Sequence, residues 1–312
     1  MMQQIRLPNG LTVSAVALGA MNFGTATPRD LSFRTLDTFL SVGGNFIDTS
    51  NNYAHWAGTG DESETLLGEW LRERRCRDRV VLATKVGFDR HGEGAGLRRE
   101  QIVYWVEESL RKLGTDHIDL YYAHTDDPAT PLEETMEAFS LLVRQGKVLT
   151  LGGSNYDTWR FAAANQTANE IGGVPFSVMQ QRFSYLYPRA DIAPKYRFND
   201  YTTRERLRYL AANNIPLVAY SCLCRGGYER DDLLPPDLVG GSRLAFIRRA
   251  AREKGVSPSA LVVAWLSGLH RLEGYPRVIP LFAASPENLL ANLRGLELDL
   301  TEAELADLTA AV

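Results

Sequence analysis

The sequence predicts an α/β fold in which eight parallel strands close into a (β/α)8 barrel, with a β-hairpin in front and extra helices. Short apolar runs alternate with helical patterns along the whole chain, and the runs are apolar throughout instead of alternating. Such strands are covered on both faces, as in a parallel sheet with helices outside. The alternative, an open doubly wound sheet, is disfavoured because no GxGxxG motif follows the first strand.

The hairpin is predicted at the start of the chain. Residues 5–8 and 11–13 flank Asn9-Gly10, a dipeptide that supplies the positive φ angles of a two-residue turn. The hairpin precedes the repeating pattern, so we expect it to cap the barrel.

Eight strands follow, each with at least one helix after it. The predicted strands cover residues 15–18, 45–48, 80–85, 118–123, 148–153, 177–180, 216–220 and 277–281. The predicted helices cover residues 31–41, 62–73, 99–113, 132–145, 157–170, 202–213, 242–254, 258–267 and 286–293. Asp30 is the expected cap of the first helix, and Thr301 caps a terminal one.

The domain organisation follows from the absence of a dividing linker. No stretch rich in Ser, Gly and Pro separates two halves, so residues 1–312 are predicted to form a single barrel domain. The glycine-rich segment 221–241 and the shorter segment 54–61 both follow strands, and we expect both to be functional loops of the active face.

Composition excludes several classes of function. A net charge of −4 without a basic tract argues against a nucleic-acid partner. No apolar run approaches membrane-spanning length and the first residues lack a signal-peptide layout, so no membrane partner and a cytoplasmic location are expected. Cys76, Cys222 and Cys224 read as free thiols, and the dispersed histidines give no metal-binding spacing.

Four chemically active side chains stand at predicted strand tips. One strand ends in Asp48, and a loop then brings Tyr53 back beside it; two further strands run into Lys85 and His124. Barrel enzymes keep their chemistry at the carboxyl ends of strands, so these four should meet at one mouth. Alone, Asp48 could be a strand-end cap and Lys85 a surface residue. Together, at matching tips, they indicate a catalytic site.

Several further stretches stand in a characteristic order around these residues. They are Phe46-Ile47-Asp48-Thr49 with Tyr53, Ala83-Thr84-Lys85, residues 109–121, His124 with residues 127–134, Gly146-Lys147-Val148, Gly153-Ser154-Asn155 and Ala219-Tyr220-Ser221. In this order and spacing the chain resembles the aldo-keto reductase family over essentially its whole length, and this resemblance implies the TIM-barrel fold.

The resemblance implies a role for each of the four residues. Tyr53 would be the general acid that protonates the carbonyl oxygen while a nicotinamide delivers hydride to the carbon. A free tyrosine has a pKa near ~10, so Lys85 would stabilise its phenolate, and Asp48 would hold Lys85 charged and in place. His124 would hydrogen-bond the carbonyl and orient it. This arrangement needs no metal.

The resemblance also implies a nicotinamide cofactor. Ser154, Asn155 and Gln180 match positions that hold the carboxamide, and Tyr220 matches the aromatic residue that stacks on the ring. The other matching positions are Ser221, Leu223 and Arg225 for the pyrophosphate and Asn292 for the adenine.

One departure concerns the choice between cofactors. The family usually presents basic residues near the start of the eighth helix, but residues 280–290 contain no Lys or Arg and include Glu287. Ser285, Asn288 and the helix N-terminus can still attract a 2′-phosphate. NADP(H) is favoured by the family's habit, and NAD(H) remains a rival.

The function inferred is an NAD(P)(H)-dependent oxidoreductase that converts an aldehyde or ketone to an alcohol, or the reverse. Candidate residues of the substrate pocket are Met21, Phe23, Trp56 and Thr125. Thr125 and the two aspartates after it make the mouth polar, so a sugar or polyol-like carbonyl compound is the hypothesis. Reaction direction and oligomeric state stay open.

Two other classes of function remain as alternatives. A nucleotide-sensing regulatory subunit could use the same barrel, although it would not need Tyr53 and Lys85 together. A metal-dependent hydrolase would need clustered His and Asp ligands at several strand tips.

Overall fold

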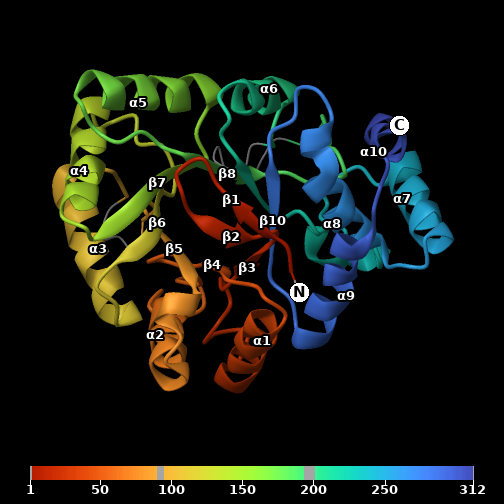
Figure 1. Ribbon diagram of the computed structural model, residues 1–312, viewed down its shortest axis with the longest axis horizontal. Helices are drawn as coiled ribbons and strands as arrows, with labels where there is room; N and C mark the ends of the chain where they lie inside the picture. Colours follow the sequence, from red (N-terminus) through yellow and green to blue (C-terminus); the bar gives the residue numbers. More distant parts are fainter. Residues whose placement is uncertain (1, 90–94, 193–200, 312) are drawn as a thin grey trace. The chain divides into compact units, whose positions relative to one another are not determined.

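The computed structural model describes residues 2–89, 95–192 and 201–311. Eight strands form a closed barrel in the order β10-β3-β4-β5-β6-β7-β8-β9, which confirms the predicted (β/α)8 fold (Figure 1). The barrel strands are β3 (Ala17–Gly19), β4 (Phe46–Asp48), β5 (Val81–Val86), β6 (Ile118–Ala123), β7 (Val148–Ser154), β8 (Val178–Arg182), β9 (Leu217–Tyr220) and β10 (Val278–Phe282). Every residue of β4, β5, β6 and β10 is buried, as the continuous apolar runs predict.

The chain falls into two compact units, Gln3–Met179 and Gln180–Val312. The organisation of residues 1–312 as a single domain stays a prediction.

The first unit opens with the predicted antiparallel hairpin of β1 (Gln4–Arg6) and β2 (Thr12–Ser14), in which Ile5 lies opposite Val13. The predicted two-residue turn is wrong, because residues 7–11 form a longer loop in which Leu7 N–H donates to Leu11 O at 2.8 Å. Only Gly10 of the Asn9-Gly10 pair has a positive φ, at 92°. The Asn9 side chain instead accepts a hydrogen bond from Leu11 N at 3.1 Å, as in an Asx-turn.

The described residues of the first unit include five α-helices, and Figure 1 shows α2, α3 and α4 outside strands β5 to β7. They are α1 (Arg29–Ser41), α2 (Glu62–Arg74), α3 (Arg99–Leu113), α4 (Leu132–Arg144) and α5 (Thr158–Glu170). The predicted cap of α1 is wrong, since Pro28 holds the N-cap position and Asp30 lies in the first turn. There its negative charge interacts favourably with the positive end of the helix dipole, but its side chain does not cap the helix.

The second unit contains helices that surround one apolar member. They are α6 (Arg204–Ala212), α7 (Gly241–Glu253), α8 (Pro258–Gly268), α9 (Pro286–Leu293) and α10 (Glu302–Ala310). Helix α8 packs against β10 and against α7, α9 and α10. Thr301 caps α10 as predicted, because its hydroxyl accepts from Glu304 N while the Glu304 carboxylate accepts from Thr301 N.

Segment 221–241 carries two 3-10 turns, η3 (Cys224–Gly226) and η4 (Asp231–Leu233). All three cysteines are buried free thiols, as predicted. Within the described ranges, no helix combines the length and apolar character needed to cross a membrane.

Candidate active site

The registers of β4, β5 and β6 bring the predicted strand tips to one end of the first unit. Asp48 lies opposite Ala83, and Lys85 lies opposite Tyr122. The backbone ladder continues beyond the strands, because Thr49 N donates to Ala83 O at 2.8 Å and His124 N donates to Val86 O at 2.7 Å. Asp48, Lys85 and His124 therefore leave neighbouring strands at the same edge.

The loop after β4 returns Tyr53 to this edge. Its backbone turns at Ala54, which takes a left-handed φ of 58°, a conformation uncommon for a residue other than glycine. Asn51 and Asn52 are buried beneath the turn. The four residues predicted from the sequence, Asp48, Tyr53, Lys85 and His124, are thus gathered in the first unit.

Lys85 is the centre of this cluster and is fully buried. Its Nζ donates to Asp48 Oδ1 at 2.5 Å, to Thr49 O at 2.6 Å and to the Tyr53 hydroxyl oxygen at 2.6 Å. A neutral amine has two N–H bonds, whereas an ammonium has three. An ammonium can donate to all three neighbours of Nζ at once, which favours the charged form of Lys85.

Tyr53 is held by two other members of the cluster, Lys85 and Asp48. Its hydroxyl accepts from Lys85 and donates to Asp48 Oδ1 at 2.9 Å. The Lys85 nitrogen also lies 4.5 Å from the centre of the Tyr53 ring, within range of a cation–π contact. Tyr53 is consequently a neutral phenol whose proton points to Asp48 in this arrangement.

Two opposing effects act on the pKa of Lys85. Burial lowers the pKa of Lys85 below its ordinary value, and the negative charges of Asp48 and Glu64 oppose this effect. Asp48 is a direct partner, whereas no hydrogen bond joins Glu64 to Lys85. Glu64 is a residue that the sequence reasoning missed.

Glu64 lies in α2 and is fully buried on the helix-covered side of β5. Its carboxylate accepts from the Thr84 hydroxyl at 2.7 Å and lies 3.5 Å from Lys112 Nζ. Lys112 also pairs with Asp61 and is itself nearly buried. Because Thr84 and Lys85 are successive strand residues, their side chains point to opposite faces of β5. A buried carboxylate thus stands behind the strand that carries Lys85.

His124 is uncharged at neutral pH. Burial, and secondly the positive charge of Lys85, hold the pKa of His124 well below 6.5. Its Nδ1 lies 3.0 Å from Ser50 Oγ, and its ring meets the edges of Phe88 and Tyr53 at centroid distances of 4.5 and 5.9 Å. The ring therefore has a polar partner on one edge and aromatic neighbours around it.

Ser154 and Asn155, predicted to hold a carboxamide, end β7 in the same unit. Asn155 takes a left-handed φ of 56°, and its Nδ2 donates to His124 O at 2.8 Å and to Ser154 Oγ at 3.1 Å. These bonds fix the backbone of His124. They also place an amide and a hydroxyl next to His124 at the tip of β6.

The remaining predicted cofactor residues belong to the second unit. Gln180 is buried on β8, and Tyr220 ends β9. Ser221, Cys224, Arg225 and Gly226 then all take positive φ angles, between 50° and 92°. Such runs orient successive N–H groups toward one side and form concave sites for anions, so this loop suits a pyrophosphate.

Helix α9 carries the predicted 2′-phosphate residues. Ser285 is the N-cap, and its hydroxyl accepts from Asn288 N at 3.3 Å. Asn292 lies one turn after Asn288 in the same helix, and Glu287 is the acidic residue of the first turn. The helix N-terminus attracts an anion, and Glu287 opposes it.

Comparison with known proteins decides the family. Residues 15–312 match the model of the aldo/keto reductase family. The chain belongs to that family. It is 32% identical to an aldo-keto reductase of Aspergillus calidoustus over 95% of this chain and 78% of the relative. It is also 32% identical to the norsolorinic acid reductase of Emericella nidulans, over 96% of this chain and 78% of that protein.

A third relative bears a different printed name. The aryl-alcohol dehydrogenase of Pestalotiopsis microspora is 29% identical, over 95% of this chain and 78% of its own length. Family and relatives together identify this aldo/keto reductase as an oxidoreductase of carbonyl compounds. Enzymes of this family generally use NAD(P)H.

The predicted pocket residues of this aldo/keto reductase differ in exposure. Met21 is half-buried after β3, and Thr125 is half-buried directly after His124. Phe23 is only 2% exposed, whereas Trp56 is 65% exposed. Their roles in substrate binding stay predictions.

The aspartates that were expected to make the mouth polar have protein partners. Asp126 Oδ1 accepts from Arg160 Nε at 3.0 Å. Asp127 accepts from Leu97 N at 2.9 Å and from the Thr130 hydroxyl at 2.6 Å. Asp126 therefore ties the loop after β6 to α5, and Asp127 ties it to the Leu97 backbone before α3.

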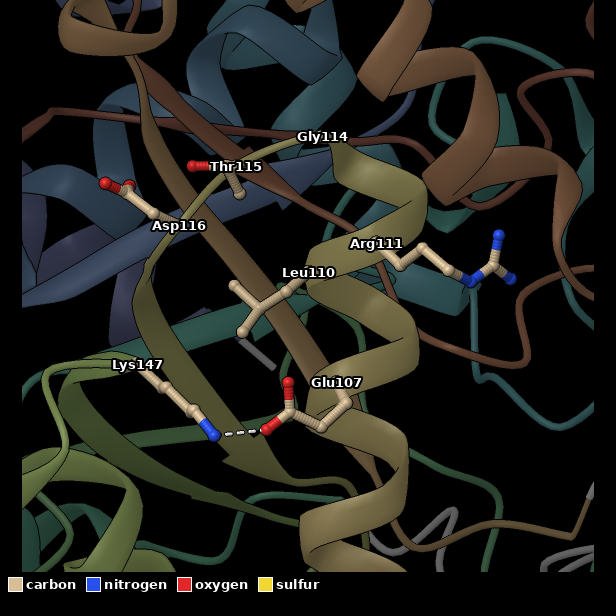
Figure 2. A pocket seen from close by; sticks show the side chains of 7 residues that line it. All are labelled: Glu107, Leu110, Arg111, Gly114, Thr115, Asp116 and Lys147. Carbon is tan, nitrogen blue, oxygen red and sulfur yellow. Dashed lines mark hydrogen bonds and ion pairs between the residues drawn. The ribbon is translucent and has the colours of Figure 1, made fainter.

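A surface hollow of about 570 Å³ lies at the opposite end of the strands (Figure 2). It is formed by the last turns of α3, by residues 114–116 before β6, and by Lys147 before β7. Glu107 and Lys147 pair across it. Barrel enzymes carry their active sites at the carboxyl ends of strands, so this hollow is separate from the cluster of Asp48, Tyr53, Lys85 and His124. Among the described residues, no group of three His, Cys, Asp or Glu side chains could hold a metal.

Proposed function

We propose that this aldo/keto reductase interconverts an aldehyde or ketone and its alcohol by hydride transfer with NAD(P)(H), and that Tyr53 exchanges the proton. The observation that carries the proposal is the position of the Tyr53 hydroxyl, 2.6 Å from the Lys85 ammonium and 2.9 Å from Asp48. A phenol between a cation and an anion can donate in one direction of reaction and accept in the other.

In carbonyl reduction the Tyr53 proton turns from Asp48 to the substrate oxygen. The phenolate that remains is stabilised by Lys85, because their attraction acts in a buried site of low dielectric. Asp48 and Thr49 O keep the ammonium in place. The nicotinamide cofactor, when bound, supplies the hydride.

The neutral state of His124 supports Tyr53 as the proton donor. Its low pKa leaves the ring without a charge at neutral pH, so it has no ionised N–H to give away. Lys85 already donates to three protein acceptors, so Tyr53 is the member of the cluster whose hydroxyl can turn to the substrate. Its ring faces that of His124 edge-on at 5.9 Å.

For the cofactor we propose NADP(H), with NAD(H) as the rival. The left-handed loop from Ser221 to Gly226 supports pyrophosphate binding, and Ser285 with the N-terminus of α9 supports binding of a 2′-phosphate. Glu287 and the lack of Lys or Arg in residues 280–290 favour the rival. Ser154, Asn155, Gln180 and Tyr220 are the proposed residues for the nicotinamide.

For the substrate we propose an aromatic carbonyl compound or benzylic alcohol. Phe88 packs on His124 at 4.5 Å and Trp56 is 65% exposed, so aromatic surface lies on the catalytic side of this unit. The names of two relatives, a norsolorinic acid reductase and an aryl-alcohol dehydrogenase, support the same class. The sugar hypothesis relied on Thr125, Asp126 and Asp127, and the two aspartates are engaged with protein groups. A single domain and a cytoplasmic location complete the proposal.

The test combines turnover with cofactor binding. Purified protein is assayed with benzaldehyde and with glyceraldehyde, each with NADPH and NADH, and cofactor binding is followed by protein fluorescence. Tyr53→Phe should lower kcat by roughly 10²- to 10⁴-fold and leave cofactor binding intact. Tyr104→Phe, at a 59% exposed position of α3, is the matched control and should behave as wild type.

Two outcomes would refute the proposal. Equal turnover by Tyr53→Phe and wild type would remove the proton-transfer role. Tight cofactor binding without turnover of any carbonyl compound or alcohol would favour the nucleotide-sensing subunit.

A further inference from the structure

Tyr228 is a fully buried tyrosine that the proposed chemistry does not use. It lies in the loop between β9 and α7, in the second unit. Its hydroxyl accepts a hydrogen bond from Tyr185 N at 3.0 Å and donates one to Cys222 O at 3.2 Å. One phenol therefore joins the start of this loop to the backbone that follows β8.

The loop segment beside Cys222 has a strained backbone. Ser221, Cys224 and Arg225 all take left-handed φ angles, between 50° and 56°, although none of them is a glycine. In this region Cβ comes too close to the following carbonyl oxygen, so such residues persist only where the surrounding structure imposes the conformation. Without that support the segment would relax to other conformations.

Arg248 of α7 supplies a second support. Its Nε donates to Tyr228 O at 2.7 Å, and its Nη2 donates to Gly227 O at 3.3 Å and pairs with Asp231 Oδ1 at 2.7 Å. The backbone of Tyr228 is thus bonded to a helix, while its side chain reaches back to Cys222 O. The segment from Cys222 to Tyr228 is held at both of its ends.

Arg225, in the middle of this segment, has groups that suit an anion. Its side chain is exposed, and within the described residues no hydrogen bond or ion pair is recorded for its guanidinium or for its backbone N–H. Backbone N–H groups of left-handed segments and guanidinium groups both bind phosphate oxygens. The strained conformation therefore decides how these donors are presented.

We propose that Tyr228 is a positioning residue whose hydroxyl holds the segment from Ser221 to Gly226 in its anion-binding form before the cofactor arrives. The inference rests on the proposed function only for the identity of the anion, which is the pyrophosphate of NAD(P)(H). A segment that is already ordered in the free protein loses less conformational freedom on binding, and this raises its affinity.

Hydrogen-exchange mass spectrometry of the cofactor-free full chain tests the positioning itself. The amides of Cys224, Gly226 and Gly227 bond to carbonyl oxygens within the loop and report on its conformation. In Tyr228→Phe the bond to Cys222 O is lost, so these amides should exchange about tenfold faster than in the wild type. Wild-type exchange of the loop in this variant would overturn the proposal. Faster exchange throughout residues 201–311 would also overturn it, because Tyr228 would then stabilise the unit as a whole.

Calorimetric titration then connects the loop with its ligand. The Kd for NADPH and the Kd for inorganic pyrophosphate should each rise about tenfold in Tyr228→Phe. Tyr185→Phe is the matched control for both experiments, because Tyr185 is equally buried and, in the described part of the chain, its hydroxyl has no hydrogen-bond partner. Unchanged Kd values beside faster loop exchange would overturn the role in binding. If the wild type bound neither NADPH nor NADH, the proposed function would fail, while the exchange result would still decide whether Tyr228 orders the loop.

Steady-state kinetics separate positioning from a general loss of structure. In Tyr228→Phe the KM for NADPH should rise about tenfold, and kcat at saturating cofactor should not fall, since the substitution leaves the proton-transfer residues unchanged. Arg248→Met, which removes the bonds to Gly227 O and Tyr228 O, should shift the same KM in the same direction. Arg249→Met, at a position of α7 whose side chain is 61% exposed, is its control and should behave as wild type. A fall in kcat with an unchanged KM in both Tyr228→Phe and Arg248→Met would overturn the proposal.

Discussion

Glu64 offers a test of how the buried charges around Lys85 depend on one another. The change is Glu64→Gln, which keeps the shape of the side chain and removes its negative charge. The amide oxygen can still accept from Thr84, whose hydroxyl lies 2.7 Å from Glu64 Oε1 in the wild type. Lys112, with a side chain only 4% exposed, loses one of its two carboxylate partners.

The expected loss of stability follows from these contacts. Removing one partner of a buried ion pair costs about 3–5 kcal/mol when the other charge is left alone. Lys112 keeps Asp61, so we expect the free energy of unfolding to fall by about 2–3 kcal/mol. Urea unfolding monitored by circular dichroism measures this difference.

Glu64→Gln also has a catalytic readout. The Glu64 charge raises the pKa of Lys85 against the effect of burial, so its removal lowers that pKa further. Lys85 then loses its proton at lower pH, and the alkaline fall of kcat/KM should move in the same direction. A purely structural role for Glu64 would lower stability and leave the pH profile in place.

The matched control is Glu107→Gln, which removes a glutamate paired with Lys147 at the protein surface. Exposed pairs contribute about 0–1 kcal/mol, so this variant should lose less than about 1 kcal/mol and keep the wild-type pH profile. If Glu64→Gln matched the control in both measurements, the inferred coupling between Glu64 and Lys85 would be refuted.

Two further predictions concern His124 and Glu287. Since the pKa of folded His124 lies well below 6.5, the unfolded chain binds an additional proton below about pH 6.5, and stability falls with falling pH by up to about 1.4 kcal/mol per unit. His124→Gln should flatten this slope in urea unfolding between pH 4 and 6.5, whereas an unchanged slope would place its origin elsewhere. Glu287→Lys should tighten NADPH binding by about tenfold relative to NADH, since it turns an anion at the start of α9 into a cation. Glu302→Lys, in the first turn of α10, is the control, and equal effects of the two variants on both cofactors would contradict a 2′-phosphate site at α9.

The clustering of Asp48, Lys85 and His124 could be predicted because these residues stand at strand tips. Asp48, Lys85 and His124 each end a run of apolar residues, and parallel strands of a barrel present their ends at one edge. Local sequence signals also predicted the bounds of several helices. Helices α3 and α9 have the predicted bounds because Gly114 ends the first, with a left-handed φ of 64°, and Ser285 begins the second.

The supporting residues depend on contacts between distant parts of the chain. Glu64 meets Lys112, 48 positions later, and a glutamate in a charged helix reads as a surface residue. One signal was available, because Glu64 shares a helix face with the buried Leu67 and Leu71. Ser50 and Asn52 read as ordinary loop residues, and only the fold brings His124 against them, 74 positions from Ser50.

The two incorrect predictions, of the hairpin turn and of the cap of α1, have causes in the local structure. The Asn9 side chain accepts a hydrogen bond from Leu11 N, and Asn9 itself does not take the left-handed backbone that the Asn-Gly pair led us to expect. Asp30 lies one position inside α1, because Pro28 already has the extended backbone of an N-cap.

The central claim is hydride transfer between a nicotinamide cofactor and a carbonyl carbon. The most direct measurement supplies reduced cofactor that is deuterated at both C4 positions, together with benzaldehyde, and records the mass of the benzyl alcohol formed. Our account predicts one deuterium per molecule, bound to the carbinol carbon, and none when unlabelled cofactor is used in deuterated water and the hydroxyl is exchanged back. Alcohol that forms without the label at this carbon would contradict direct hydride transfer.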